Sequence, residues 1–134
     1  TLRTLFPYTT LFRSLPVEIQ PLSKPYANWT GGVFRGVVLA DGKPVPFAEI
    51  EIEYINHSVD VGKNSFGKKD YVTAPQASFK ALTAYADSQG IVTIGLPRAG
   101  WWGIAALDIG ATKTYQGKPL SQDAVLWVQA KDMK

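Results

Sequence analysis

The sequence is poor in the side chains that build covalent, thiolate and multi-histidine sites. It has no cysteine, which excludes disulfides, thiolate zinc sites, iron–sulfur clusters and cysteine nucleophiles. It has one histidine, His57, so no site within this chain can use two imidazoles. Methionine occurs once, against twelve glycines and nine prolines. This balance predicts many turns and few long helices.

Long apolar runs are also lacking. No segment approaches the roughly 18 to 20 apolar residues of a membrane-spanning helix, so we expect a chain that does not span a membrane. With 134 residues, 46% of them hydrophobic and 19% charged, the composition is that of one ordinary globular domain. A chain of this length can bury a sizeable core without disulfides or metals.

The net charge of +3 and the pI near 9.2 suggest at first an anionic partner. Two of the basic residues, Arg3 and Arg13, lie within residues 1–14, which contain no acid. Residues 15–134 therefore hold 12 basic and 11 acidic side chains. We expect no nucleic-acid partner from so even a balance.

Residues 1–14 differ from the rest of the chain in lacking both turn-forming patterns and a sustained hydrophobic period. They read TLRTLFPYTTLFRS, and the run TLFPYTTLFRS resembles the translation of a common DNA sequencing adapter. Pro7 and Tyr8 interrupt any apolar core of a signal peptide. We expect residues 1–14 to be a non-native, disordered segment that replaces a missing native beginning. Residues 15–134 are then a single domain.

Seven segments have the character of short strands between turns. Alternation, β-branched residues and flanking Pro, Gly and Asp identify them. Residues 78–86 fit a helix or a strand, and we favour a strand because a β-branched run follows at hairpin distance. The segments are 15–22, 33–39, 48–54, 78–86, 91–94, 101–107 and 124–130. The pattern predicts an all-β fold, an antiparallel sandwich of two sheets.

The clearest strand, 48–54, carries Glu49, Glu51 and Glu53 on one face and apolar residues on the other. Its register is fixed, because a slip of one residue would bury three carboxylates. The three glutamates could bind a cation. They could equally form a solvated face, or pair with Lys or Arg on the next strand.

Four tryptophans include a neighbouring pair. Trp101 and Trp102 point to opposite faces of a strand, so we expect one in the core and the other on the surface beside Arg98. A surface tryptophan there could be an interaction anchor, a carbohydrate platform or a contact for another part of the protein. Trp127, in an alternating strand, is predicted to lie in the core.

The connection 57–77 lacks strong periodicity and is long for a compact domain. Its best metal candidate is His57 with Asp60, helped by Asn56 or Asp70, because imidazole and carboxylate are ligands that divalent transition metals accept. The alternative is a histidine at a strand end that bonds to backbone or water.

Enzyme activity is not expected. A Ser-His-Asp triad would have to use His57, and no serine lies in a Gly-x-Ser-x-Gly turn. The acidic residues are scattered over strands and turns rather than paired across a cleft. Gly31 and Gly32 lack the spacing and the lysine of a phosphate-binding loop.

Four stretches resemble a family of bacterial periplasmic proteins that is linked with nickel and cobalt uptake. The most specific stretch is Pro-Arg-Ala-Gly-Trp-Trp-Gly; all four are 41–45, 53–57, 96–103 and 121–128. The resemblance covers residues 15–134 and implies an immunoglobulin-like or prealbumin-like sandwich of about seven strands. It implies a periplasmic or extracytoplasmic accessory domain that handles nickel or cobalt ions. Its partners would be membrane transporter components or the missing N-terminal domain.

The order of strands and turns also resembles carboxypeptidase-regulatory and transthyretin-like modules. Those modules are mostly structural or binding domains. A structural or interaction module, or a carbohydrate-binding module using Trp101 or Trp102, is therefore the alternative to a role in metal uptake.

Overall fold

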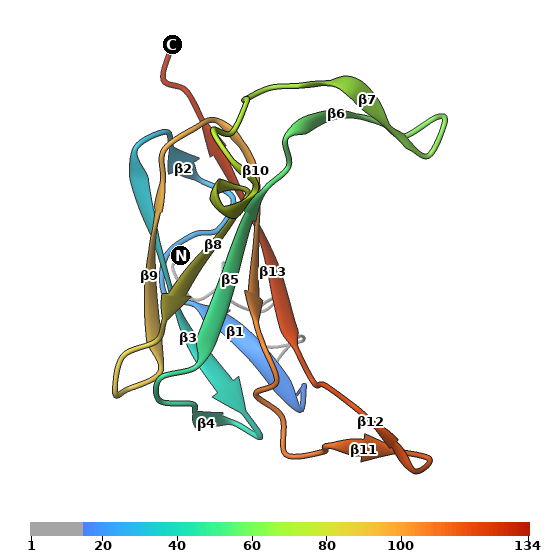
Figure 1. The fold of residues 1–134 in the computed structure, drawn as a ribbon. Coiled ribbons are helices and arrows are strands. Elements are labelled where there is room, and N and C mark those ends of the chain that lie inside the picture. The colour runs from blue at the N-terminus through green and yellow to red at the C-terminus, as the bar shows by residue number, and fades with distance from the viewer. Residues whose placement is uncertain (1–14) are drawn as a thin grey trace.

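The computed structural model describes residues 15–134 and is built almost entirely from strands (Figure 1). The expectation of a non-native, disordered segment falls on residues 1–14, which lie outside the described part. The first sheet has β3 in its middle, paired antiparallel with all three other strands. Its strands are β1 (Val17–Pro21), β3 (Gly32–Ala40), β4 (Lys43–Pro44) and β9 (Ile91–Leu96).

The second sheet has five strands in the order β2-β13-β10-β5-β8. The pairs are antiparallel except for β2, which runs parallel to β13. The strands are β2 (Asn28–Trp29), β5 (Glu49–Tyr54), β8 (Ala81–Tyr85), β10 (Gly100–Ala106) and β13 (Ala124–Lys131). No helix within 15–134 has the length and apolarity to cross a membrane.

The core lies between the two sheets and is filled by alternate residues of their strands. The largest fully buried side chains are Phe34, Val38, Ile50, Val92, Leu96, Ile104 and Val128. They come from β3 and β9 on one side and from β5, β10 and β13 on the other. The expected all-β sandwich is confirmed, and each of the seven predicted segments contains a strand.

Two turns show why the sequence folds this way locally. Asp41 and Gly42 have φ of 48° and 74°, the left-handed pair that a two-residue hairpin requires between β3 and β4. Between β8 and β9 the Asp87 carboxylate accepts hydrogen bonds from the backbone N–H of Gln89 and Ile91. That side chain therefore holds the chain as it crosses from one sheet to the other.

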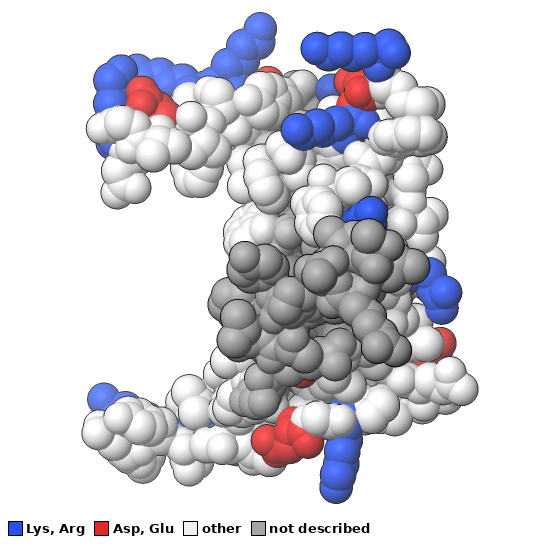
Figure 2. Space-filling model, turned by 180° about the vertical axis from the view of Figure 1, so that it is seen from behind, with Lys and Arg blue, Asp and Glu red and all other residues white. Residues whose placement is uncertain are grey.

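Two hairpins project from the sandwich on the same side (Figure 1). One is formed by β6 (His57–Asp60) and β7 (Ser65–Asp70), the other by β11 (Thr114–Tyr115) and β12 (Lys118–Pro119). In the reverse view they form two arms around a hollow surface, with lysines on the upper arm (Figure 2). The connection 57–77, which lacks strong periodicity in the sequence, thus contains a hairpin, followed by the 3-10 helix η2 (Ala77–Phe79).

One expectation about the core is wrong. Trp127 lies on the outer side of the second sheet with 51% of its surface exposed, whereas Leu126 and Val128 face inward. Both sides of β13 are apolar, so alternation identifies which residues share a face but not which face is buried. The smaller side chains of β13 fill the core, and Trp127 takes the solvent side.

Candidate functional site

The projecting β6–β7 hairpin brings His57 and Asp70 together. The two residues are opposite each other in the antiparallel register, and His57 Nδ1 lies 3.3 Å from Asp70 Oδ1. The side chains are 37% and 44% exposed. Nδ1 itself is buried and makes no well-aligned hydrogen bond with any described residue. This nitrogen is therefore a buried polar atom that lies next to a carboxylate without forming a hydrogen bond to it.

Asp60, the other expected metal ligand, lies elsewhere on the same hairpin. It pairs with Ser65 at the turn end of β6, whereas His57 begins that strand. Its carboxylate accepts a hydrogen bond from the Lys63 backbone N–H at 3.1 Å and lies 3.3 Å from Lys63 Nζ. The structure therefore gives Asp60 the role of closing the turn and does not bring it to His57.

Asn56 is also engaged in local structure. Its amide nitrogen donates to the Val72 carbonyl at 2.7 Å, and its amide oxygen accepts from the Val72 N–H at 2.8 Å. These bonds fasten the base of the hairpin. Within residues 15–134 no three His, Cys, Asp or Glu side chains are grouped to hold a metal ion. His57 and Asp70 can therefore supply two ligands of an ion, and further ligands would come from water or another molecule.

The segment from Pro97 to Gly103 anchors the upper end of the sandwich. Trp102 is 5% exposed, and its indole N–H donates to the Arg98 carbonyl at 3.1 Å. The Tyr54 ring packs against Trp102 at 4.9 Å between centroids, and its hydroxyl donates to the Ala99 carbonyl at 2.9 Å. Of the expected interaction residues, Trp102 thus lies in the core, while Trp101 is 44% exposed.

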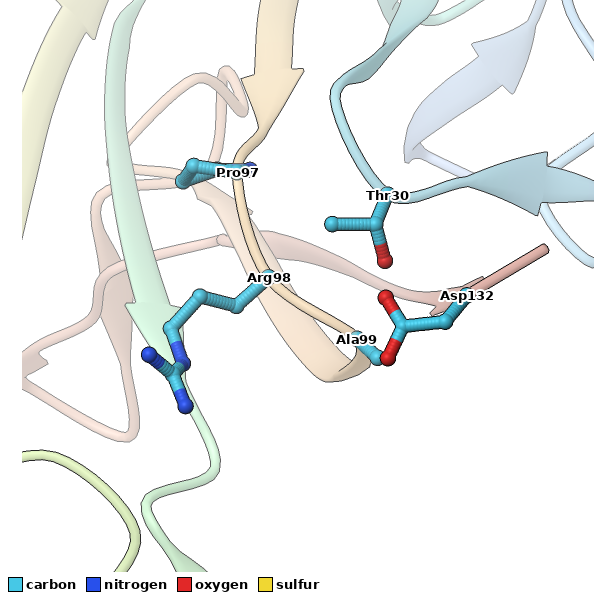
Figure 3. Close-up of a pocket in the computed structure, with 5 residues that line it drawn as sticks. All are labelled: Thr30, Pro97, Arg98, Ala99 and Asp132. Carbon is cyan, nitrogen blue, oxygen red and sulfur yellow. The ribbon is translucent and has the colours of Figure 1, made fainter. Parts of the chain in front are cut away.

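Arg98 borders a pocket of about 270 Å³ that is shown in Figure 3. The Thr30 hydroxyl oxygen is buried there without a hydrogen-bond partner among the described residues, and the Asp132 carboxylate turns toward it. The Arg98 guanidinium points to the other side of its own chain segment (Figure 3). The guanidinium and the buried Thr30 hydroxyl therefore lie apart in this pocket.

The solvent side of the second sheet, which we call the outer face, carries aromatic residues on β10 and β13. A Cβ at Gly103 would lie 2.9 Å from Cζ3 and 3.1 Å from Cη2 of Trp127, so this indole lies across β10. Trp101 is opposite Gln129 in the register, which makes it the diagonal cross-strand neighbour of Trp127. By strand alternation and register the outer face consists of Trp29, Glu49, Glu51, Glu53, Ala81, Thr83, Tyr85, Trp101, Gly103, Ala105, Val125, Trp127, Gln129 and Lys131.

The three glutamates of β5 form a row along the middle of the outer face. Within residues 15–134 two ion pairs form, Lys63–Asp60 and Lys113–Asp108, and His57 lies close to Asp70; none of these contacts involves the row. Of the alternatives for the row, pairing with Lys or Arg on an adjacent strand is thus not found among residues 15–134. The cross-strand neighbours in register are Ala81, Thr83, Tyr85, Gly103 and Ala105. Carboxylates about 7 Å apart repel by roughly 0.6 kcal/mol in water, and salt screens this further.

One carboxyl group has a perturbed pKa, near the base of the β11–β12 hairpin. The Ser121 hydroxyl donates to Asp123 Oδ1 at 2.5 Å, and the Asp108 backbone N–H donates to the same oxygen at 2.7 Å. These two bonds, with a smaller contribution from Lys113, lower the pKa of Asp123. The group fastens two loops together, which is a structural role.

Comparison with known proteins gives one match. The model of a family described as a domain of unknown function (DUF4198) matches residues 9–110. That range begins within the segment 1–14 and ends after β10, so β13 lies beyond it. No curated protein and no solved structure matches the chain.

Proposed function

Because the chain belongs to this DUF4198 family of unknown function, we propose its role from its own residues: a non-enzymatic, extracytoplasmic accessory domain of nickel or cobalt uptake. The domain captures the metal ion as cargo and docks to the membrane transporter that moves it. The resemblance of Pro97–Gly103 and three other stretches to nickel- and cobalt-linked periplasmic proteins supports this proposal.

The observation that carries metal capture is the close approach of His57 Nδ1 and Asp70 Oδ1, 3.3 Å apart on a projecting hairpin. Ligand atoms at adjacent corners of an octahedron lie about 3.0 Å apart when each bond is about 2.1 Å long. A small rotation of the two partly exposed side chains therefore suffices to place both on one ion. Imidazole nitrogen and carboxylate oxygen are a ligand pair that Ni(II) and Co(II) accept.

Two protein ligands make a weak and open site. Most of the coordination shell stays with water, so the ion remains exchangeable and available to a second set of ligands. These properties suit a domain that passes metal on better than one that stores it. The pair lies where β6 begins and β7 ends, at the base of the hairpin that projects from the sandwich (Figure 1), and both side chains are partly exposed, so a transporter component can reach them.

The test is a titration of the chain with Ni(II), followed by calorimetry and by broadening of the His57 ring signals in NMR. We expect saturable binding that His57→Ala abolishes and Asp70→Asn weakens about tenfold. Asp60→Asn removes the same charge from the same hairpin, three residues from His57, and should leave binding unchanged.

Heat no greater than that of buffer, with unbroadened His57 signals, would overturn metal capture by these residues. Equal losses of Ni(II) affinity in Asp60→Asn and Asp70→Asn would show that binding depends only on the net charge of the hairpin. That result would also refute the assigned ligand pair.

A further inference from the structure

The outer face is a broad sheet surface whose tryptophans are half exposed. Trp127 is 51% and Trp101 is 44% exposed, and Val125 beside them is exposed as well. The six-membered ring of Trp127 lies against Gly103, where a Cβ would stand 2.9 Å from Cζ3, and half of the side chain stays exposed. An aromatic face fixed in this way offers a large contact area at little cost in conformational entropy.

The acidic row borders this aromatic area directly. Glu53 is opposite Gly103 in the register, and the Trp127 ring covers Gly103. Neighbouring strands are about 4.8 Å apart, so the indole and the Glu53 carboxylate flank the same patch of surface. A ligand that contacts the ring there meets an unpaired carboxylate within reach.

This combination selects a cation that is flat and donates several hydrogen bonds. A guanidinium stacks on an indole and donates to a carboxylate with two parallel N–H groups, whereas an ammonium does neither as well. Sugar rings also stack on tryptophan, but three carboxylates that form no ion pair within residues 15–134 favour a positively charged ligand over a neutral one.

The spacing of the row further indicates the form of the ligand. Glu49, Glu51 and Glu53 repeat every second residue, about 7 Å apart along one strand. Alternate side chains of an extended polypeptide repeat at the same distance. We propose that the outer face docks an extended polypeptide segment that carries arginine at alternate positions. Its arginines pair with the glutamate row, and one of them stacks on Trp127.

The binding is independent of metal, and the test is made in the presence of a chelator. The probe is a labelled, capped peptide that alternates arginine with threonine and is long enough to follow β5, and fluorescence anisotropy gives its Kd. Comparison peptides carry lysine or glutamate in place of arginine. A neutral cello-oligosaccharide serves as the carbohydrate probe.

We expect the arginine peptide to bind, the lysine peptide to bind several-fold more weakly and the glutamate peptide not to bind. Replacing both Glu51 and Glu53 by Gln should raise the Kd roughly tenfold or more, since two charge-assisted pairs are lost. Trp127→Ala should raise the Kd about fivefold through lost stacking. Glu18→Gln removes one charge from the first sheet and should change the Kd less than twofold.

Three results would overturn the proposal. The first is equal binding of the arginine and glutamate peptides. The second is a loss in Glu18→Gln as large as that in the Glu51 and Glu53 variant. The third is binding of the oligosaccharide, abolished by Trp127→Ala, without binding of the arginine peptide, which would make this a carbohydrate face. Failure of Ni(II) binding at His57 would leave all these results unchanged, so the two proposals fail separately.

Discussion

Substituting Gly100 by alanine tests how the Pro97–Gly103 segment is held. Gly100 has φ of 134°, a conformation that residues with a Cβ rarely adopt. A Cβ placed there would lie 2.7 Å from Cε2 and 2.9 Å from the hydroxyl oxygen of Tyr54. The Tyr54 ring cannot retreat freely, because it packs against Trp102 and its hydroxyl bonds to the Ala99 carbonyl.

The expected cost follows from these contacts. Backbone strain at this φ costs about 2 kcal/mol. Displacing Tyr54 loses a hydrogen bond worth about 1 kcal/mol and an aromatic contact worth about 1 kcal/mol. We therefore expect Gly100→Ala to lower the free energy of unfolding by roughly 3–4 kcal/mol and the Tm by roughly 10–15 °C.

Urea unfolding followed by tryptophan fluorescence measures the effect, and Gly42→Ala is the matched control. Gly42 also has positive φ, 74°, but a Cβ there meets nothing within 4 Å. Gly42→Ala should lower the free energy of unfolding by only about 1 kcal/mol, which is the cost of backbone strain alone. If Gly100→Ala and Gly42→Ala cost the same, the clash with Tyr54 and the anchoring role of that ring are refuted.

Two further predictions concern the core and pH. Trp102→Ala should lower the free energy of unfolding by about 3–5 kcal/mol. This loss should exceed that of Trp127→Ala by at least about 2 kcal/mol, because Trp102 is buried and Trp127 is half exposed. Equal losses in urea unfolding would contradict this prediction. The pKa of Asp123 is lowered in the folded chain, chiefly by the Ser121 hydroxyl, so its stabilisation is present above about pH 4 and is lost as the pH falls through the folded pKa. The difference in unfolding free energy between the natural chain and Asp123→Asn should therefore be larger at neutral pH than at about pH 3; a difference independent of pH would refute the assignment.

The sequence predicts the strands that build the core, since burial of one face imposes alternation on them. In β5, for example, alternation places Ile50 and Ile52 on one face and Glu49 and Glu51 on the other, so the isoleucine face must be the buried one. The β6–β7 and β11–β12 hairpins escape prediction because their exposed strands have no buried face to impose a period.

The candidate metal pair depends on one of these hairpins. His57 and Asp70 are neighbours only through the register of β6 with β7, which includes an irregularity between His57 and Val59. Sequence reasoning named Asp70 only as a helper, because proximity along the chain favoured Asp60. The outer face was missed for a related reason: Trp127 and the glutamates lie on strands that are distant in sequence and joined through β10.

The position of β13 has a consequence for how the chain folds as it is synthesised. This strand lies inside the second sheet, between β2 and β10, yet it follows all the other described strands along the chain. Until it has paired, the backbone groups on one side of β10 are unpaired and β2 has no partner strand. A nascent chain that pauses after β10, or a fragment that ends where the family match ends, exposes a sheet edge whose unpaired backbone groups can pair with another chain. We therefore expect such fragments to aggregate or to require a chaperone, since the sheet closes only when β13 pairs with β10 and with β2, which lies far earlier in the sequence.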